Sequence, residues 1–294
     1  MDSSTAQTAR EERVSVVIAT RDRRTDLERT LGHLTALPER PRVVVVDNAS
    51  RDGTAAMVRR LFPAVEVLAL RDNAWGAART IGARHVDTQY VAFSDDDSWW
   101  APGSLGAAAD VLDSHPRLGL VAARVLVGSQ QRLDPTCVAM ASSPLAQSAD
   151  LADAAILGFI ACGSIVRRSA FLEVGGFDAR LEIGGEEELL ALDLAAAGWG
   201  LHYLDAVVAH HHPSPARDST RRRRQLRNLL WSAWLRHPLR SALGRSVRVA
   251  GAAAAWDRAA AGALLDALAG LPWIVRARRK VPRHVEVKLA ELET

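Results

Sequence analysis

Cysteines, lysines and long apolar runs are scarce in this chain of 294 residues. Its two cysteines, Cys137 and Cys162, exclude a disulfide framework and a zinc site with four cysteine ligands. No apolar run reaches about 18 residues, which argues against a spanning helix. The first 15 residues lack the apolar core of a secretory signal. The composition, 48% hydrophobic and 24% charged, is that of a folded globular protein, which we expect to be cytoplasmic.

Positive charge is concentrated towards the C-terminus and is carried almost entirely by arginine, since lysine occurs twice among 37 basic residues. Residues 217–294 contain 17 Lys and Arg and 6 Asp and Glu, a net charge of +11. Residues 1–216 contain 20 and 28, a net charge of −8. A basic segment on an acidic body indicates an anionic partner, such as a membrane surface, a nucleic acid or an acidic protein.

Apolar β-type runs alternate with helical patterns in the first two hundred residues. Strands are predicted at 14–19, 43–46, 65–70 and 90–93, and helices between them at 25–37, 55–61 and 74–85. Further strands are expected at 120–127, 160–166 and 201–209, with a helix at 186–197. This alternation predicts parallel βαβ units in an open α/β sheet, whose ligands bind outside the carboxyl ends of the strands.

The chain divides into three predicted parts. Residues 1–13 form a flexible N-terminus, residues 14–216 the α/β domain, and residues 217–294 a basic, Ala- and Arg-rich helical extension. Within the extension, residues 220–234 place leucines and Trp234 on one stripe and arginines on the other. Such a helix suits an anionic membrane surface, and it equally suits packing on the α/β domain with a solvated Arg face. Nucleic-acid binding is not expected, because no recognised motif accompanies the basic run.

Three consecutive carboxylates, the acidic run Asp95, Asp96 and Asp97, end the predicted strand at 90–93. Adjacent carboxylates repel one another unless a cation neutralises them. The spacing of Asp95 and Asp97 can serve a divalent ion and a sugar nucleotide together. The alternative is a solvated loop in which Asp97 or Ser98 caps a helix.

Two other polar groups follow strands. Asp47 can accept hydrogen bonds from a nucleobase imide or a ribose hydroxyl, or can form an Asx turn before the next helix. His210, His211 and His212 follow the last predicted strand, where a neutral imidazole would suit Mn²⁺ or a similar cation. The alternative for each histidine is a polar loop. A zinc hydrolase is disfavoured because recognised ligand spacings such as HEXXH are absent.

Glu186, Glu187 and Glu188 lie in the first turn of a predicted helix, after two glycines. A carboxylate there can take a proton from an attacking hydroxyl. It can also simply complement the helix dipole.

Seven motifs occur in the order known from one family. They are VSVVIATRDR at residues 14–23, VVVVDNASRDGT, NAWGAAR, FSDDDSW, GSIVRRSAFLEVGGFD, GEE…AAGW and AVVAH. Over about residues 14–213 the chain therefore resembles a family 2 glycosyltransferase with the GT-A fold. The resemblance implies an inverting, nucleotide-sugar-dependent enzyme with a mostly parallel central sheet flanked by helices, here followed by the C-terminal extension.

The resemblance implies roles for the nucleotide-binding positions. Thr20 and Arg21 fall where the first strand of the family meets the nucleotide. Asp47 matches the aspartate that hydrogen-bonds the base, and Arg79 matches a residue near the nucleotide. The acidic run matches the DxD motif of the family, with Asp96 by the ribose.

Further roles concern the metal and the acceptor. By the same resemblance, Asp97 binds a Mg²⁺ or Mn²⁺ that bridges the diphosphate, and His210 is a further metal ligand or diphosphate contact. Gly163 and the GGFD turn at 175–178 match an acceptor-side segment. Glu187 matches the catalytic base, with Glu186 in reserve.

The chain departs from the family at three positions. Glu187 stands where the family usually has Asp, Leu189 where Asp is common, and Asp193 where Arg is frequent. The choice of base among the three glutamates therefore stays open.

The sequence predicts transfer of a sugar from a UDP or dTDP donor to a hydroxyl of a glycan, a lipid-linked acceptor or a metabolite. A catalytically degenerate nucleotide-sugar-binding module is an alternative, and a sugar-phosphate nucleotidyltransferase is a weaker one, since the ATRDR segment lacks the glycines of its loop. The expected location is cytoplasmic, with peripheral attachment to the inner face of the membrane through the basic extension.

Overall fold

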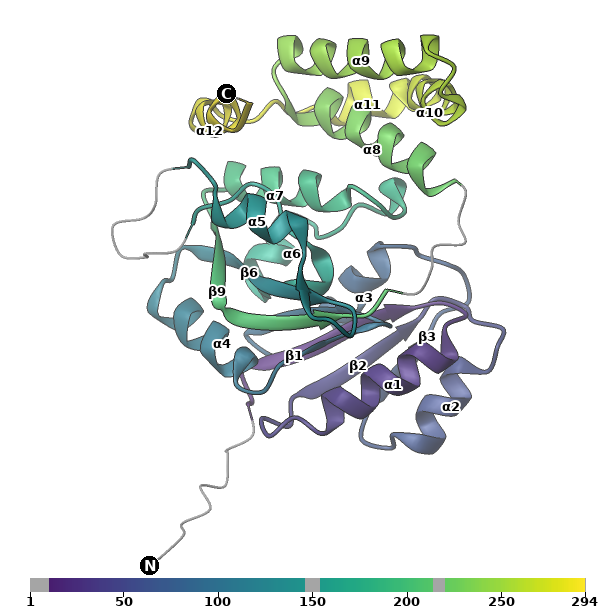
Figure 1. The fold of residues 1–294 in the computed structure, drawn as a ribbon, viewed down its shortest axis with the longest axis vertical. Coiled ribbons are helices and arrows are strands. Elements are labelled where there is room, and N and C mark those ends of the chain that lie inside the picture. Colours follow the sequence, from purple (N-terminus) through teal and green to yellow (C-terminus); the bar gives the residue numbers. More distant parts are fainter. Residues whose placement is uncertain (1–10, 146–153, 214–219, 294) are drawn as a thin grey trace, which may run out of the picture.

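The structure is a computed structural model that describes residues 11–145, 154–213 and 220–293 (Figure 1). Most of the predicted flexible N-terminus lies outside these residues, and so does the predicted boundary at 216–217. The described residues form a sheet flanked by helices and a group of C-terminal helices beside it (Figure 1).

Nine strands of the described residues form one mixed sheet in the order β3-β2-β1-β4-β8-β6-β9-β5, with β7 paired to β6. The strands β3, β2, β1 and β4 are parallel, as are β6 and β9, whereas β8 runs antiparallel to both of its neighbours. Their bounds are β1 (Val14–Thr20), β2 (Arg42–Asp47), β3 (Glu66–Ala69), β4 (Tyr90–Asp95), β5 (Ser98–Trp100), β6 (Leu118–Val127), β7 (Arg132–Leu133), β8 (Ser164–Arg167) and β9 (Gly200–His211).

Helices cover both faces of this sheet, which explains why its central strands are apolar throughout instead of alternating. In β1, Val16 and Ile18 pack on one side and Val17 on the other, and all three are fully buried. One face carries α1 (Arg24–Thr35), α2 (Thr54–Leu61) and α4 (Ser104–Ser114). The other carries α3 (Ala77–His85), α5 (Pro135–Ala141), α6 (Arg168–Glu173) and α7 (Glu186–Ala196) (Figure 1).

The predicted α/β fold is confirmed, and the first three βαβ units lie close to their predicted bounds. The middle of the chain differs more. The strand predicted at 160–166 is a 3₁₀ turn at Ala161–Gly163 followed by the shorter β8. The strand β5 was not predicted, because its three residues are too few to show a pattern. It pairs antiparallel with the end of β9.

The C-terminal helices are α8 (Arg221–Arg236), α9 (Leu239–Ala254), α10 (Arg258–Ala269), α11 (Leu271–Ala277) and α12 (Arg283–Glu293). The apolar stripe of α8 packs against a small core with side chains of α7, α9, α10 and α11, in which Leu230 is buried and Leu226, Leu229 and Trp234 are partly buried. The protein itself therefore covers much of this stripe, and its use at a membrane surface stays a prediction. The alternative, packing on the α/β domain, is confirmed.

Exposed apolar side chains of the extension include a stripe on α9, namely Leu239, Leu243 and Val247. Attachment to a membrane stays a prediction. No single helix in the described part of the chain has the length and apolarity to cross a bilayer. The consecutive helices α10 and α11 reach that length and composition only together, with a 59° bend between them.

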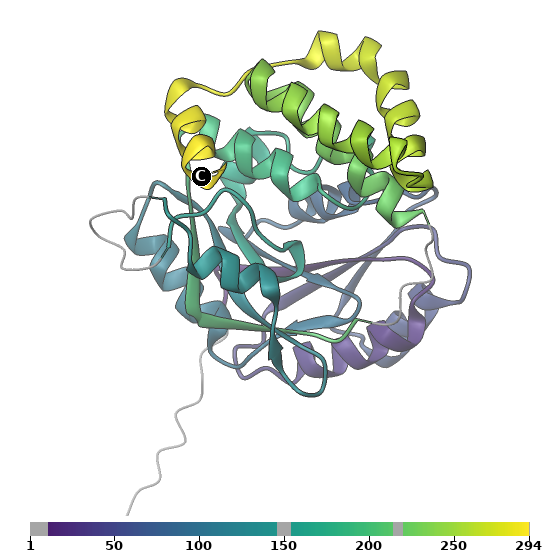
Figure 2. The ribbon, with the colours of Figure 1, turned by 45° about the horizontal axis from the view of Figure 1, so that its top comes forward.

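The extension is tied to α7 along its length. Asn228 Nδ2 of α8 donates to the carbonyl oxygens of Leu181 and Gly184 at 2.6 and 2.7 Å. Arg236 Nη2 donates to Asp193 Oδ2 at 3.0 Å. Figure 2 shows α12 against α7, where His284 Nε2 lies 3.2 Å from the carbonyl oxygen of Ala195. The helix that carries the three glutamates therefore has the extension as its support.

Candidate functional site

Three strands bring polar residues to one edge of the sheet. Thr20 ends β1, Asp47 ends β2 and Asp95 ends β4. In the pairing register, Thr20 lies opposite Asp47, and Ala19 lies opposite Asp95. The strand ends thus meet at the edge where open α/β sheets bind ligands, as expected.

The acidic run is held by hydrogen bonds and is not a solvated loop. Thr20 Oγ1 donates to Asp96 Oδ2 at 3.0 Å. The guanidinium of Arg23 donates through Nε to Asp96 Oδ1 at 3.1 Å and through Nη2 to Asp97 Oδ2 at 2.8 Å. Asp97 is buried, and Ser98 begins β5. The alternative of a helix cap at Asp97 or Ser98 is therefore wrong.

Burial raises the pKa of Asp96 to about 7, and the charges of Asp97 and Asp95 add to this effect while Arg23 opposes it. Arg23 neutralises Asp96 and Asp97 of the acidic run, and Asp95 lies beside them, so a cation would stabilise the cluster further.

The sequence did not single out Arg23, and Arg21 was expected at this place instead. The side chain of Arg21 is 40% exposed, with its Nε 3.5 Å from Asp22 Oδ2. Its position just after β1, in the ATRDR segment, is the sequence feature that could have identified Arg23. Which of the two arginines faces the acidic run depends on the turn, where Asp22 adopts a positive φ of 53°.

The histidine beside the acidic run is His211, so the placement predicted for His210 is wrong. His211 Nε2 lies 3.3 Å from Asp97 Oδ1. His210 stacks on Trp99 instead, with ring centroids 5.9 Å apart. The cause is the alternation of side chains along a strand: β9 pairs His211 with Ser98 and His210 with Trp99, so the two rings lie on opposite faces.

The electrostatics agree with this placement. Burial lowers the pKa of His211, but the carboxylates of Asp97 and Asp95 more than offset this and leave its pKa above the ordinary value. Burial lowers the pKa of His210, and His212 and His33 add to this.

A donor set that fits a divalent cation surrounds His211. One donor atom each of Asp95, Cys162 and His211 lies within 4.8 Å of the other two. Asp97 adds a carboxylate next to His211. Carboxylates with one imidazole suit Mn²⁺ or Mg²⁺. Burial raises the pKa of the Cys162 thiol well above its ordinary range, so Cys162 stays protonated in the absence of a cation.

Asp47 forms an Asx turn, which the sequence offered as the alternative to contact with a nucleobase or ribose. Its Oδ1 accepts a hydrogen bond from the backbone N of Ser50 at 3.0 Å. Next to it, the amide of Asn48 accepts from Ala74 N at 3.0 Å and donates to the Trp75 carbonyl at 3.2 Å. The turn after β2 is thus fastened to the loop before α3, and Asp47 is fixed beside Thr20.

Arg79 of α3 connects the acidic run to the glutamates of α7. Its guanidinium is 5% exposed, forms an ion pair with Asp95 and lies 3.6 Å from Glu186 Oε1. Burial lowers the pKa of Arg79, but the two carboxylates more than reverse this effect and keep the group charged. The predicted nucleotide-side and acceptor-side residues therefore share one buried ionic network.

The three glutamates of the first turn of α7 point in different directions. Glu186 is buried, and its Oε2 accepts a hydrogen bond from Gly184 N. Burial and the charge of Glu187 raise the pKa of Glu186. Glu188 Oε1 pairs with Arg245 at 2.5 Å and lies 3.3 Å from His237 Nε2.

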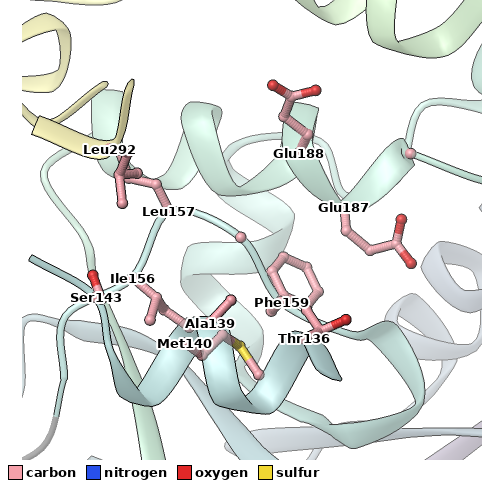
Figure 3. Close-up of a pocket in the computed structure, with 12 residues that line it drawn as sticks. Thr136, Ala139, Met140, Ser143, Ile156, Leu157, Phe159, Glu187, Glu188 and Leu292 are labelled. Atoms are coloured by element: carbon pink, nitrogen blue, oxygen red, sulfur yellow. The ribbon is translucent and has the colours of Figure 1, made fainter. Parts of the chain in front are cut away.

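Glu186 lines a cavity on the side of the GGFD turn. Glu187 lines another cavity of about 410 Å³, together with α5, residues 156–159, Glu188 and Leu292. Figure 3 shows its carboxylate on the side of Thr136 and Phe159, whereas Glu188 points the other way. Because Glu186 and Glu188 are held by other groups, the geometry favours Glu187 among the three.

The GGFD turn lies on the other side of α7. The backbone N of Phe177 donates to Thr80 Oγ1 of α3 at 2.9 Å. With α3 and Arg236, the turn lines a second cavity of about 490 Å³. Gly163 ends the 3₁₀ turn before β8 and packs against β6, since a Cβ on it would lie 2.5 Å from Val125 Cγ2. Neither segment lines the cavity beside Glu187.

Curated relatives with similar sequences are glycosyltransferases. The N-acetylglucosaminyl-diphospho-decaprenol L-rhamnosyltransferase of Mycobacterium tuberculosis is 30% identical over 226 residues, which cover 63% of this chain and 71% of that protein. The pre-mycofactocin glycosyltransferase of the same organism is 31% identical over 285 residues, or 92% of this chain. This chain spans 57% of the length of that second relative.

Solved structures with the same fold include two glycosyltransferases. The mannosyltransferase PcManGT from Pyrobaculum calidifontis, in complex with GDP-Man and Mn²⁺, matches 96% of this chain with a TM-score of 0.59 and 22% identity. S. aureus TarS in complex with UDP matches 75% of this chain with a TM-score of 0.55 and 18% identity. At these identities the two likenesses establish the fold.

The sequence model of glycosyl transferase family 2 matches residues 15–175. This match runs from β1 to the first glycine of the GGFD turn and includes the acidic run and Arg79. The resemblance seen in the sequence is confirmed: the chain belongs to glycosyl transferase family 2 and has the GT-A fold.

Proposed function

We propose that this glycosyltransferase is metal-dependent and inverting, and that it moves a sugar from a UDP or dTDP donor to the hydroxyl of a glycan, lipid-linked or small-molecule acceptor. One observation carries the proposal. Arg79 joins the acidic run at the sheet edge to the start of α7, where Glu187 faces a cavity. A donor site and an acceptor site therefore lie on either side of one ionic network.

The nucleotide would lie over the ends of β1 and β2. Asp47 offers its second carboxylate oxygen to a base imide, while the Asx turn holds the first. Uracil and thymine both present such an imide, which supports UDP and dTDP. Asp96, which is held by its bonds to Thr20 and Arg23, would lie by the ribose. TarS is solved with UDP and UDP-GlcNAc, and PcManGT with GDP-Man.

A Mg²⁺ or Mn²⁺ would be held by Asp97 and His211, with Asp95 alongside. When bound, such an ion neutralises the diphosphate and stabilises it as the leaving group. The residues of this chain prepare the place. Arg23 holds Asp96 and Asp97 through Nε and Nη2, and His211 lies 3.3 Å from Asp97. His210 is not part of this set, because its ring stacks on Trp99.

Glu187 would serve as the base. As the acceptor oxygen attacks the anomeric carbon, the new C–O bond forms and the bond from that carbon to the diphosphate oxygen breaks. The electron pair leaves with the nucleoside diphosphate, and the hydroxyl proton passes to Glu187. A single displacement of this kind inverts the anomeric centre. Glu186, buried and bonded to Gly184 N, helps to orient the turn.

The test combines binding and turnover. Thermal shifts with UDP-, dTDP- and GDP-sugars, with and without Mn²⁺, should show a stabilisation that needs the metal and one nucleotide and that Asp97→Ala removes. Glu187→Gln should keep this stabilisation but lower hydrolysis or transfer of the donor sugar by about 10²- to 10⁴-fold. Wild-type protein that no donor stabilises would overturn the proposal, and so would full turnover by Glu187→Gln.

A further inference from the structure

The cavity beside Glu187 is almost entirely apolar. Its volume is about 410 Å³, and its walls come from α5, the segment 156–159, the start of α7 and the last turn of α12 (Figure 3). The apolar lining includes Met140, Ile156, Leu157, Phe159 and Leu292. A cavity of this size and lining, next to a catalytic carboxylate, has the usual features of a small-molecule subsite.

Its few polar groups are unevenly placed. Thr136 and Glu187 lie together at one side, as Figure 3 shows. Ser143 lies farther along the wall, and the carboxylate of Glu188 is turned away towards Arg245 and His237. A sugar in this cavity would lose hydration at several hydroxyls and find few partners, which costs free energy for each unpaired polar group. A hydrocarbon or aromatic group has no such hydration to lose.

We propose that this cavity binds an apolar group of the acceptor, a hydrocarbon chain or an aromatic ring, adjoining the hydroxyl that Glu187 deprotonates. The inference rests on the proposed function and names the acceptor class for it. The reactive hydroxyl lies at the Thr136 and Glu187 side, and the apolar group extends towards Met140 and Ile156. Acceptors made of sugar alone are excluded from this subsite.

The C-terminal extension completes the subsite. Leu292 of α12 contributes one wall, although it lies more than one hundred residues from Glu187 in the sequence. Contacts of Val285 and Leu289 with the core hold α12 against α7. The acceptor subsite is thus formed jointly by the α/β domain and the extension.

The test measures binding of an apolar probe and is independent of turnover. N-phenyl-1-naphthylamine fluoresces when it enters an apolar cavity, so wild-type protein should give a saturable signal. Ala139→Trp, which places an indole among the lining residues, should raise the probe Kd at least tenfold. The matched control is Val138→Trp, since Val138 is the neighbouring residue of α5, is 52% exposed and does not line the cavity. It should keep the Kd within twofold.

A second filling variant guards against misfolding. A Cβ added at Gly158 meets no heavy atom within 4 Å, so a side chain can begin there, and Gly158→Phe should also block the probe. Octyl and phenyl β-glucopyranoside should distinguish a chain from a ring by which of them displaces the probe more strongly. Methyl β-glucopyranoside should displace it at least tenfold more weakly than the better of the two.

Unchanged probe binding by both filling variants would overturn the inference, as would displacement by the methyl glucoside as strong as by the other two. Stabilisation by nucleotide and Mn²⁺, measured on the same variants, separates the two proposals. If stabilisation by nucleotide and Mn²⁺ persists while the wild-type protein gives no probe signal, the apolar subsite is wrong and the glycosyltransferase proposal stands. If nucleotide and Mn²⁺ give no stabilisation while the probe binds as described, the donor proposal fails and the apolar cavity stands.

Discussion

Two adjacent histidines of β9 point to opposite faces of the sheet, and this decides which of them can serve the acidic run. His211 faces Asp97, while His210 stacks on Trp99, which in turn stacks on His33 with ring centroids 4.0 Å apart. The run of three histidines showed that imidazoles follow the last strand. It could not show which imidazole faces inwards, since that requires the pairing partner, β5.

Substitution of the two histidines tests this placement. We expect His211→Ala to weaken Mn²⁺ binding in the presence of UDP by at least about 10-fold, because an imidazole next to Asp97 is lost. His210→Ala is the matched control and should change Mn²⁺ affinity by no more than about twofold, since its ring lies on the other face. Mn²⁺ titrations followed by thermal shift give both numbers. A larger effect of His210→Ala would contradict the placement.

Residues at strand ends were predictable because a single rule places them. Thr20, Asp47 and Asp95 follow apolar runs, and the parallel order of the strands brings their ends together. Arg23 was not predictable in the same way. Its contacts with Asp96 and Asp97 join positions 73 and 74 residues apart, across a turn whose direction no local pattern reveals.

At the scale of the elements, two of the three departures of α7 from the family pattern, Leu189 and Asp193, have a common cause. Leu189 is 5% exposed and packs in the small core with Leu230 and Trp231 of α8. Asp193 pairs with Arg236 at the end of α8. Both positions therefore face the extension, and a carboxylate at 189 would be buried in this core. From the sequence these substitutions weakened the choice of base, whereas the structure shows that they match α7 to its neighbours.

Two helix glycines provide a test of how tightly the elements pack. Gly82 of α3 is buried, and a Cβ on it would lie 2.4 Å from Val17 Cγ1. We expect Gly82→Ala to destabilise the protein by about 1–3 kcal/mol through overpacking. Gly32 of α1 has no heavy atom within 4 Å of the same position. Gly32→Ala should stabilise by up to about 1 kcal/mol, since alanine is the better helix former.

Urea unfolding of both variants measures these differences directly. Equal stabilities for the two alanine variants would mean that α3 can move away from β1, contrary to the packing seen here. Sequence alone predicted both helices but could not distinguish the two glycines, because the difference lies in the strand beneath one of them.

At the scale of the whole molecule, the basic extension acts on the site as a support. The sequence presented it as a separable tail with an anionic partner, since its charge contrasts with that of the preceding residues. Several of its arginines find partners within the described chain, such as Asp193 and Glu188 on α7 and Asp266 on α10. Charge along the sequence indicated that the extension meets something acidic. Only the fold could show that this acidic partner includes helix α7.

Asn228 is the residue through which this support reaches the glutamates. It is fully buried in α8, and its Nδ2 donates to the carbonyls of Leu181 and Gly184, just before Glu186 begins α7. Asn228→Ala leaves the part-buried Gly184 carbonyl without this donor, at a cost of about 1–3 kcal/mol, whereas the Leu181 carbonyl keeps a bond from Arg227 Nη2 at 3.2 Å. Because the affected turn directly precedes Glu187, we expect kcat to fall about 10-fold or more while UDP affinity changes less.

Ser232→Ala is the matched control on the same helix. Ser232 is also fully buried, but its Oγ has no hydrogen-bond partner in the part of the chain that the structure describes. Its removal should leave kcat unchanged and should not lower stability, since a buried hydroxyl without a partner costs free energy. Steady-state kinetics with thermal unfolding of both variants separate support of the site from general stability. If Asn228→Ala lowered the melting temperature but kept kcat, the extension would stabilise the fold without positioning Glu187.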